Sequence, residues 1–172
     1  MSQLETLDLA PLDEALDEFA GKRGALIPIL QRVELPDSTY IEIAEHCRRK
    51  GVTFLCSPFD SESADFLDGL GVPAFKVASA DLTNLPLIDH LIQKGKPLIL
   101  STGMSRPDEV EFTVKFLKER KAQFALLHCN STYPAAFEDI NLRYMDQLRK
   151  FGVPVGYSGH ERGIAVSTVA AA

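Results

Sequence analysis

Five apolar segments of this chain each end within three residues of a serine or threonine. The segments cover residues 52–56, 74–78, 97–101, 124–128 and 153–157, and their starts lie 22 to 29 residues apart. This spacing is about the length of one strand followed by a helix that returns to the start of the next strand. Near-continuous apolar strands are typical of parallel sheets that are covered on both faces. The pattern therefore predicts an α/β fold with about five parallel strands.

Segments with helical periodicity lie between these strands. We expect helices at residues 38–50, 61–70, 86–94, 106–120, 141–150 and from about 161 to the end of the chain. Asp60 or Ser61 would cap the second of these helices, and Ser105 would cap the fourth. Residues 1–35 are hard to interpret: leucines at helical spacing predict a short helix, and a proline interrupts an apolar run that would suit an edge strand.

A parallel sheet with right-handed crossovers can close into a (β/α)8, or TIM, barrel, which typically needs about 250 residues. This chain has 172 residues. We therefore expect a partial barrel over residues 36–172, with the first two strands and the last strand missing and the final helix cut short, after a poorly determined segment at 1–35. Unpaired sheet edges would favour self-association, so a homo-oligomer is expected.

Composition excludes several classes of partner. The formal charge of −6 disfavours nucleic acids and anionic membranes. No apolar run approaches the roughly 18 residues of a membrane helix. The three cysteines are widely spaced and fit reduced thiols, which predicts a cytoplasmic protein. No glycine pattern typical of nucleotide binding is present.

The hydroxyl residues at the strand ends predict a binding site. Carboxyl ends of parallel strands share one edge of a sheet, and a hydroxyl can donate to an anion without adding charge. The segment Ser101-Thr102-Gly103 precedes a helix whose free amides would add donors for a phosphate. The alternative is that these residues only cap that helix, which Ser105 could do alone. We expect a small anionic ligand at this edge.

Lys76 lies inside an apolar strand, where a lysine needs an anionic partner or a lowered pKa. It would either bind a phosphate or carboxylate as a cation, or act as a Schiff-base nucleophile. The alternative is a side chain that reaches solvent from the start of the strand.

Three further polar residues follow strand ends. His160 is a candidate metal ligand or acid–base group, although no partner at metal-ligand spacing is visible. Asp81 and Tyr133 could hydrogen-bond a polyol, or could serve turns and caps. His128 would be either a supporting residue of the site or a core histidine.

Five motifs in order resemble the N-acetylneuraminate (sialic acid) synthase family. They are Phe54-Leu55-Cys56-Ser57-Pro58-Phe59-Asp60, Ala74-Phe75-Lys76-Val77-Ala78-Ser79, Leu100-Ser101-Thr102-Gly103-Met104, Leu127-His128-Cys129 through Tyr133-Pro134, and Gly156-Tyr157-Ser158-Gly159-His160. Enzymes of this family are (β/α)8 barrels. They condense phosphoenolpyruvate with an N-acetylmannosamine-type sugar, release phosphate, and use a divalent metal such as Mn²⁺ or Mg²⁺.

The resemblance implies a role for each matching residue. Phosphoenolpyruvate would be surrounded by Ser57, Lys76, Ser79, Ser101, Ser131 and Ser158. Asp81 and Tyr133 would contact the sugar, and His160 would be one of two histidine metal ligands. The implied reaction is attack by C3 of phosphoenolpyruvate on the sugar aldehyde, then addition of water at C2 and loss of phosphate. Lys76 would be catalytic by neutralising charge on the phosphate.

The chain also departs from the family. No counterpart is found in residues 1–35 for the strand with the catalytic glutamate or for the next strand with its lysine, and the second metal histidine would lie beyond Ala172. Ala80 replaces a usual glycine, and Gly159 replaces a usual aspartate. We therefore expect the 172-residue chain to be inactive alone. Two alternatives stay open: a Schiff-base aldolase that uses Lys76, and a non-catalytic remnant that binds a phosphorylated metabolite.

Overall fold

The computed structural model describes residues 35–172. The short helix and the interrupted apolar run expected near the start of the chain lie outside the described residues. The chain divides into two compact units, Met1–Val52 and Thr53–Ala172. The family-based division expected at residues 35/36 stays a prediction.

The described part of the first unit is one helix, α3 (Asp37–Lys50). It follows Pro36 and ends at Gly51, whose φ of 66° lies in the left-handed region that favours glycine. Three basic residues in its last turn oppose the negative end of the helix dipole. The predicted helix at 38–50 is therefore confirmed.

The second unit contains a four-stranded parallel sheet. Its strands are β1 (Phe75–Val77), β2 (Leu98–Ser101), β3 (Phe124–Cys129) and β4 (Val155–Ser158), and each pairs with the next in the order β1-β2-β3-β4. Lys76 pairs with Ile99, and Leu127 pairs with Gly156. The predicted α/β class with a parallel sheet is thus confirmed.

The predicted strand at residues 52–56 does not form. Residues 52–58 have no regular secondary structure and make no ladder with β1. Phe54 and Cys56 instead pack their side chains against the hydrophobic core. An apolar run is required for this packing as well as for a strand, so hydrophobicity alone predicted one strand too many.

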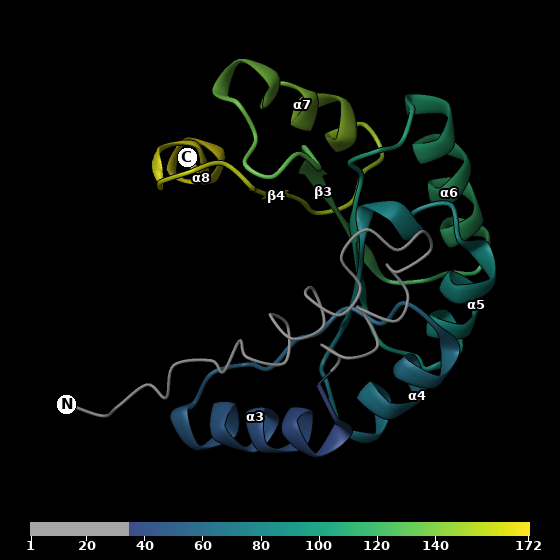
Figure 1. Cartoon of the computed structure of the whole chain (residues 1–172). Coiled ribbons are helices and arrows are strands. Elements are labelled where there is room, and N and C mark those ends of the chain that lie inside the picture. The colour runs from purple at the N-terminus through teal and green to yellow at the C-terminus, as the bar shows by residue number, and fades with distance from the viewer. Residues whose placement is uncertain (1–34) are drawn as a thin grey trace, which may run out of the picture. The chain divides into compact units, whose positions relative to one another are not determined.

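The second unit begins with helix α4 (Ser61–Gly69), which precedes β1. Each strand is then followed by a helix: α5 (Leu85–Gln93), α6 (Pro107–Glu119), α7 (Tyr144–Arg149) and α8 (Ala165–Ala171), with 3-10 turns η1 (Ser79–Asp81) and η2 (Phe137–Asp139). Figure 1 shows α5, α6 and α7 on the same side of the sheet. The last two helices begin later than predicted, because positive φ angles at Asn141 and Gly163 interrupt the preceding backbone. No helix among residues 35–172 is long and apolar enough to cross a membrane.

Of the two predicted N-caps, the structure confirms that of α4 and contradicts that of α6. The carboxylate of Asp60 accepts a hydrogen bond of 2.6 Å from the backbone N–H of Ser63, so Asp60 caps α4 as expected. The predicted Ser105 cap of α6 is wrong. The backbone N–H of Arg106 donates to the carboxylate of Glu109 at 2.7 Å, and Ser105 lies outside the cap.

The core lies between the sheet and its helices. Alternate strand residues such as Phe75, Leu100 and Leu126 are fully buried, together with Ile88 and Leu117 from the helices. The residues between them point to the other face of the sheet and are only half-buried, as the burial pattern of β1 shows around Lys76. That second face places Lys76 where a ligand can reach it.

Candidate functional site

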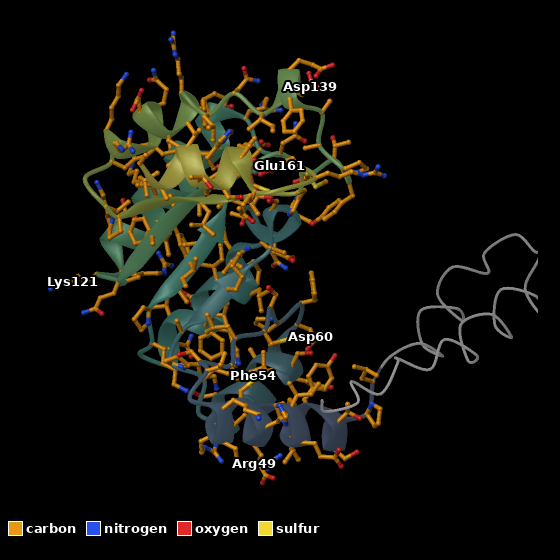
Figure 2. All side chains as sticks on the ribbon, turned by 90° about the vertical axis from the view of Figure 1, so that its left-hand side faces the viewer. Arg49, Phe54, Asp60, Lys121, Asp139 and Glu161 are labelled. Atoms are coloured by element: carbon orange, nitrogen blue, oxygen red, sulfur yellow. The ribbon has the colours of Figure 1, made fainter. Side chains whose placement is uncertain are left out.

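A cavity of about 370 Å³ lies at the carboxyl ends of the strands. Figure 2 marks the two ends of β3: Lys121, which precedes the strand, lies far from Asp139, which follows it. The cavity is lined by Ser57, Phe59, Lys76, Ala78, Ser79, Ala80, Ser101, Met104, Cys129, Ser131, Tyr133, Ser158 and His160. Parallel sheets place their ligand sites at this edge.

Eight of the nine residues predicted for the site line this cavity. They are Ser57, Lys76, Ser79, Ser101, Ser131, Tyr133, Ser158 and His160. The ninth, Asp81, does not line it. Its carboxylate accepts a hydrogen bond of 3.0 Å from the side-chain amide of Asn84, and the side-chain oxygen of Asn84 accepts from the N–H of Leu87 at the start of α5. Asp81 thus supports a helix cap in this structure.

Lys76 is the cation of the cavity. Its Nζ donates to the carbonyl oxygen of Val77 at 3.0 Å. Burial lowers the pKa of Lys76, and the electrostatic interaction with the nearby Cys129 opposes that change. No carboxylate of the described residues forms an ion pair with Lys76. The ammonium group is therefore available to an anionic ligand.

Ser101 has a buried hydroxyl without a partner. The residue is 2% exposed, and its Oγ is the only buried side-chain nitrogen or oxygen in residues 35–172 that makes no hydrogen bond. Leaving such a group unpaired costs about 1–3 kcal/mol. The neighbouring Thr102 differs, because its hydroxyl donates to the carbonyl of Leu127 at 3.0 Å. A ligand atom in the cavity would satisfy Ser101.

His160 is held in one tautomer by a backbone contact. Its Nδ1 lies 2.7 Å from the carbonyl oxygen of Asn130, which can only accept, so Nδ1 carries a proton. In the neutral imidazole Nε2 then accepts from the hydroxyl of Tyr133 at 2.9 Å. The Cys129 sulfur lies 3.9 Å from Nδ1. No three His, Cys, Asp or Glu side chains in the described region gather where a metal ion could be held.

His128 is buried and hydrogen-bonded, and it lines the second cavity described below. Its Nε2 lies 2.5 Å from the carbonyl oxygen of Ile140, and its ring contacts Tyr144 and Tyr157. It joins β3 to the segment before α7, so both interpretations, a supporting residue of the site and a core histidine, stay predictions.

The sequence analysis missed Phe59, Met104 and Cys129 as cavity residues. Phe59 and Met104 are 65% and 76% exposed, so they form an apolar rim. Strand alternation could have found Cys129, because it follows Leu127 on the same face of β3. None of the three carries a hydroxyl, so the pattern of hydroxyl residues at strand ends did not indicate them.

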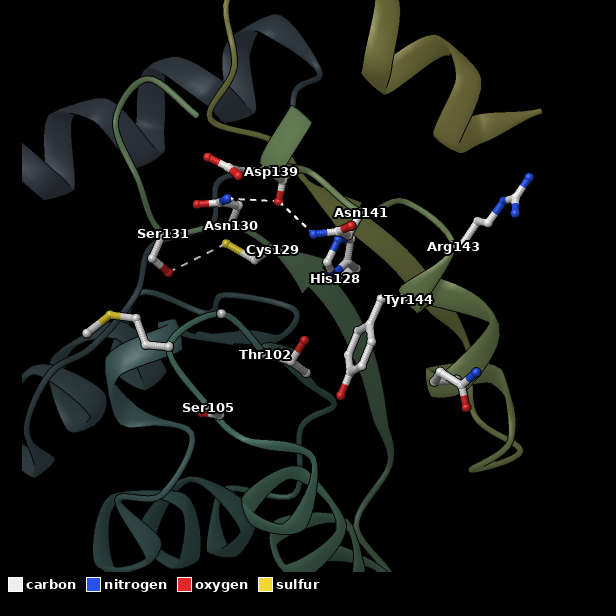
Figure 3. A pocket seen from close by; sticks show the side chains of 13 residues that line it. Thr102, Ser105, His128, Cys129, Asn130, Ser131, Asp139, Asn141, Arg143 and Tyr144 are labelled. Atoms are coloured by element: carbon white, nitrogen blue, oxygen red, sulfur yellow. Dashed lines mark hydrogen bonds between the residues drawn. The ribbon is translucent and has the colours of Figure 1, made fainter. Parts of the chain in front are cut away.

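A second cavity of about 600 Å³ adjoins the first and shares Met104, Cys129 and Ser131 with it (Figure 3). In Figure 3 the side-chain amides of Asn130 and Asn141 both donate to the backbone carbonyl of Asp139, each at 3.1 Å. These bonds hold the loop between β3 and α7, and this loop forms one wall of the second cavity.

The fold and the cavity at its strand ends define an α/β protein of the kind that binds ligands beyond the carboxyl edge of a parallel sheet. The NeuB family model matches residues 10–172, and the chain belongs to the NeuB family. The match begins at residue 10, within the segment 1–35 in which no counterpart of the family was expected.

Two curated relatives illustrate the family. N,N'-diacetyllegionaminic acid synthase of Campylobacter jejuni is 39% identical over 150 residues, which cover 85% of this chain and 45% of the relative. N-acetylneuraminate-9-phosphate synthase of Homo sapiens is 36% identical over 144 residues, which cover 83% of this chain and 40% of the relative. The chain thus spans less than half the length of these relatives.

A solved structure has the same fold. The crystal structure of N-acetylneuraminic acid synthetase from Leptospira borgpetersenii, in complex with citrate, is similar with a TM-score of 0.80 and 31% sequence identity. The similarity covers 91% of this chain and 55% of that protein. The relatives are therefore synthases of sialic-type acids.

Proposed function

We propose that the cavity binds phosphoenolpyruvate for condensation with an N-acetylmannosamine-type sugar, giving a sialic-type acid and phosphate. The observation that carries the proposal is the buried, unpartnered hydroxyl of Ser101 in a cavity that also holds the unpaired ammonium of Lys76. A phosphate or carboxylate oxygen would satisfy both groups. The names of the two relatives, a diacetyllegionaminic acid synthase and an N-acetylneuraminate-9-phosphate synthase, support a product of this class.

The hydroxyls and the ammonium group that line the cavity, here called the cradle, would act by electrostatics and by positioning the ligand. Hydroxyls of Ser79, Ser131 and Ser158 would donate to the anion from three strand ends, and that of Ser57 would donate from the segment before α4. Lys76 would neutralise charge that shifts onto the leaving phosphate. Tyr133 would contact the sugar from the rim. The proposed sugar contact of Asp81 would require Asp81 to leave its hydrogen bond with Asn84.

The family resemblance also implies a divalent metal, Mn²⁺ or Mg²⁺. The described residues supply a single candidate ligand, Nε2 of His160, and do not fit a complete metal site. For this chain the proposal is therefore limited to His160 as one ligand. The described residues do not account for activation of the sugar aldehyde.

The proposal also covers the fold: the four-stranded sheet would be part of a (β/α)8 barrel, since consecutive strands lie side by side as they do in such barrels. The chain would be cytoplasmic and would self-associate through its open sheet edges. That turnover by the 172 residues alone is negligible stays a prediction from the family resemblance.

A binding measurement tests the proposal. Calorimetry should detect weak binding of phosphoenolpyruvate and of inorganic phosphate, and Lys76→Ala should abolish it. Lys121→Ala is the matched control, because Lys121 is exposed and lies at the opposite end of β3 (Figure 2). Unchanged binding in Lys76→Ala would remove Lys76 from the site.

One observation favours a second candidate function. Burial lowers the pKa of Lys76, and a lowered pKa also suits a Schiff-base lysine of an aldolase. Borohydride treatment in the presence of pyruvate distinguishes the two reactions. A stable adduct on Lys76 would support the aldolase, whereas no adduct together with phosphate binding supports the synthase-type cradle. A non-catalytic remnant would bind phosphate and release none from phosphoenolpyruvate, even with sugar and Mn²⁺.

A further inference from the structure

Gly103 lies where hydroxyls from two other strand ends meet. It follows β2, whereas Ser79 follows β1 and Ser131 follows β3. A Cβ atom placed on Gly103 would overlap Ser131 Oγ, and would lie only 2.9 Å from Ser79 Oγ and 3.0 Å from the carbonyl oxygen of Cys129. Contacts this short are not tolerated by a real side chain, so the groups around Gly103 leave no room for a methyl group.

The backbone conformation of Gly103 does not explain the glycine. The glycines with positive φ angles in the described residues are Gly51, Gly71, Gly95, Gly152 and Gly163, and Gly103 is not among them. Its φ angle therefore does not lie in the left-handed region that favours glycine. Glycine is required here for the close approach of neighbouring groups.

The two hydroxyls could not both avoid a methyl group and keep their positions. Serine Oγ atoms move only by rotation about χ1, in steps between staggered rotamers. Ser79 and Ser131 both line the cavity of the proposed site, so such a rotation would turn a donor away from the ligand. The carbonyl of Cys129 belongs to β3 and cannot rotate without moving the strand.

We propose that Gly103 is a positioning residue that sets the spacing of the Ser79 and Ser131 hydroxyls and thereby the size of the anion that the cavity accepts. Its missing side chain lets the ends of β1, β2 and β3 approach until both hydroxyls donate to one tetrahedral or planar anion. This inference rests on the proposed function, because it assumes that the cavity binds an anion.

A double-mutant cycle tests the inference, with inorganic phosphate as the probe and calorimetry as the measurement. Gly103→Ala should weaken phosphate binding about tenfold, the equivalent of one lost charge-assisted hydrogen bond. Ser131→Ala removes the overlapping Oγ, so adding Gly103→Ala to that variant should weaken binding less than it does in the wild type. The loss that remains would come from Ser79 Oγ and the carbonyl oxygen of Cys129, which still lie close to the new methyl group. Gly69→Ala is the control, since Gly69 is exposed at the end of α4 and has nothing within 4 Å of its Cβ position.

Thermal unfolding tests the contact between a methyl group at position 103 and Ser131 Oγ without a ligand. Gly103→Ala should lower the melting temperature of the wild-type chain more than that of Ser131→Ala, and Gly69→Ala should lower neither. Equal losses of affinity in the two backgrounds, or unchanged phosphate binding in Gly103→Ala, would overturn the positioning role while leaving the proposed function intact. Absence of phosphate and phosphoenolpyruvate binding in the wild type would overturn both.

Discussion

The rings of Tyr133 and His160 stack with their centroids 3.9 Å apart, and the tyrosine hydroxyl donates to Nε2 of the imidazole at 2.9 Å. The other ring nitrogen of His160 donates to the carbonyl of Asn130. Both nitrogens of the imidazole are therefore engaged, although the histidine lies in a cavity that is open to solvent. A group that binds Nε2 must first displace the tyrosine hydroxyl.

Tyr133→Phe tests this arrangement. Phenylalanine keeps the stacked ring and removes the donor, so Nε2 of His160 should react faster with diethyl pyrocarbonate. The loss of one neutral hydrogen bond of about 1 kcal/mol corresponds to a roughly fivefold increase in rate. Mass spectrometry of the modified peptide measures it, with His46 of α3 as the internal reference. An equal rate in the two proteins would show that the hydroxyl does not protect Nε2 in solution.

Lys76 should reduce the stability of the fold in return for ligand binding. Its folded-state pKa lies below the ordinary value of 10.5 because burial disfavours the ammonium. Lys76→Met keeps the length of the side chain without the charge, and should raise the free energy of unfolding at pH 7 by about 0.5–2 kcal/mol, the range of single stabilising substitutions. Phosphate binding should be lost in the same variant.

The pH dependence of this difference has a definite sign. Between the lowered folded-state pKa of Lys76 and 10.5, the unfolded wild-type chain binds more protons than the folded chain, so wild-type stability gains from Lys76 as the pH rises. Lys76→Met lacks this gain. The advantage of the variant should therefore shrink from pH 7 toward pH 10.5, as followed by urea unfolding. An advantage that grows with pH would contradict the lowered pKa.

The buried hydroxyl of Thr113 in α6 donates to the carbonyl of Leu82 at 2.9 Å. Leu82 directly follows η1, the turn that begins at Ser79. Thr113→Val has nearly the same shape and leaves that carbonyl without its donor, so it should destabilise the fold by about 1–3 kcal/mol. Thr168→Val is the control, because Thr168 also donates to a backbone carbonyl but is exposed. Its cost should stay within about 0.5 kcal/mol.

The sequence predicted the elements where burial and spacing act together. Four strands and their helices were found because each strand is apolar and each helix has one apolar face. The run at 52–56 was misassigned because Phe54 and Cys56 bury their side chains without a strand partner. The α6 cap was misassigned because the local pattern does not distinguish Ser105 from the Glu109 contact.

The rule that strand ends share one edge predicted a common site, and the family resemblance implied the roles of its residues. Eight of those residues line one cavity, and their roles stay predictions. Two features could not be predicted in this way. The bond between His160 and Asn130 uses a backbone carbonyl, which carries no side-chain signal. The role of Gly103 depends on Ser79 and Ser131, which are distant in the sequence, so only coordinates reveal the lack of space.

Exposed apolar side chains beside β4 should drive self-association. Within the described residues β4 pairs only with β3, and Ile164 and Val169, next to and within α8, are 80% and 66% exposed. Uncovered strand edges and apolar patches favour contact between copies of a chain. Light scattering should therefore find oligomers of the wild-type chain, and Ile164→Lys with Val169→Lys should shift the mass toward the monomer. Phe112→Lys on α6, where Phe112 is 60% exposed, is the control and should leave the oligomers unchanged. A monomeric wild type would contradict the prediction, and an equal shift with Phe112→Lys would place the contact elsewhere.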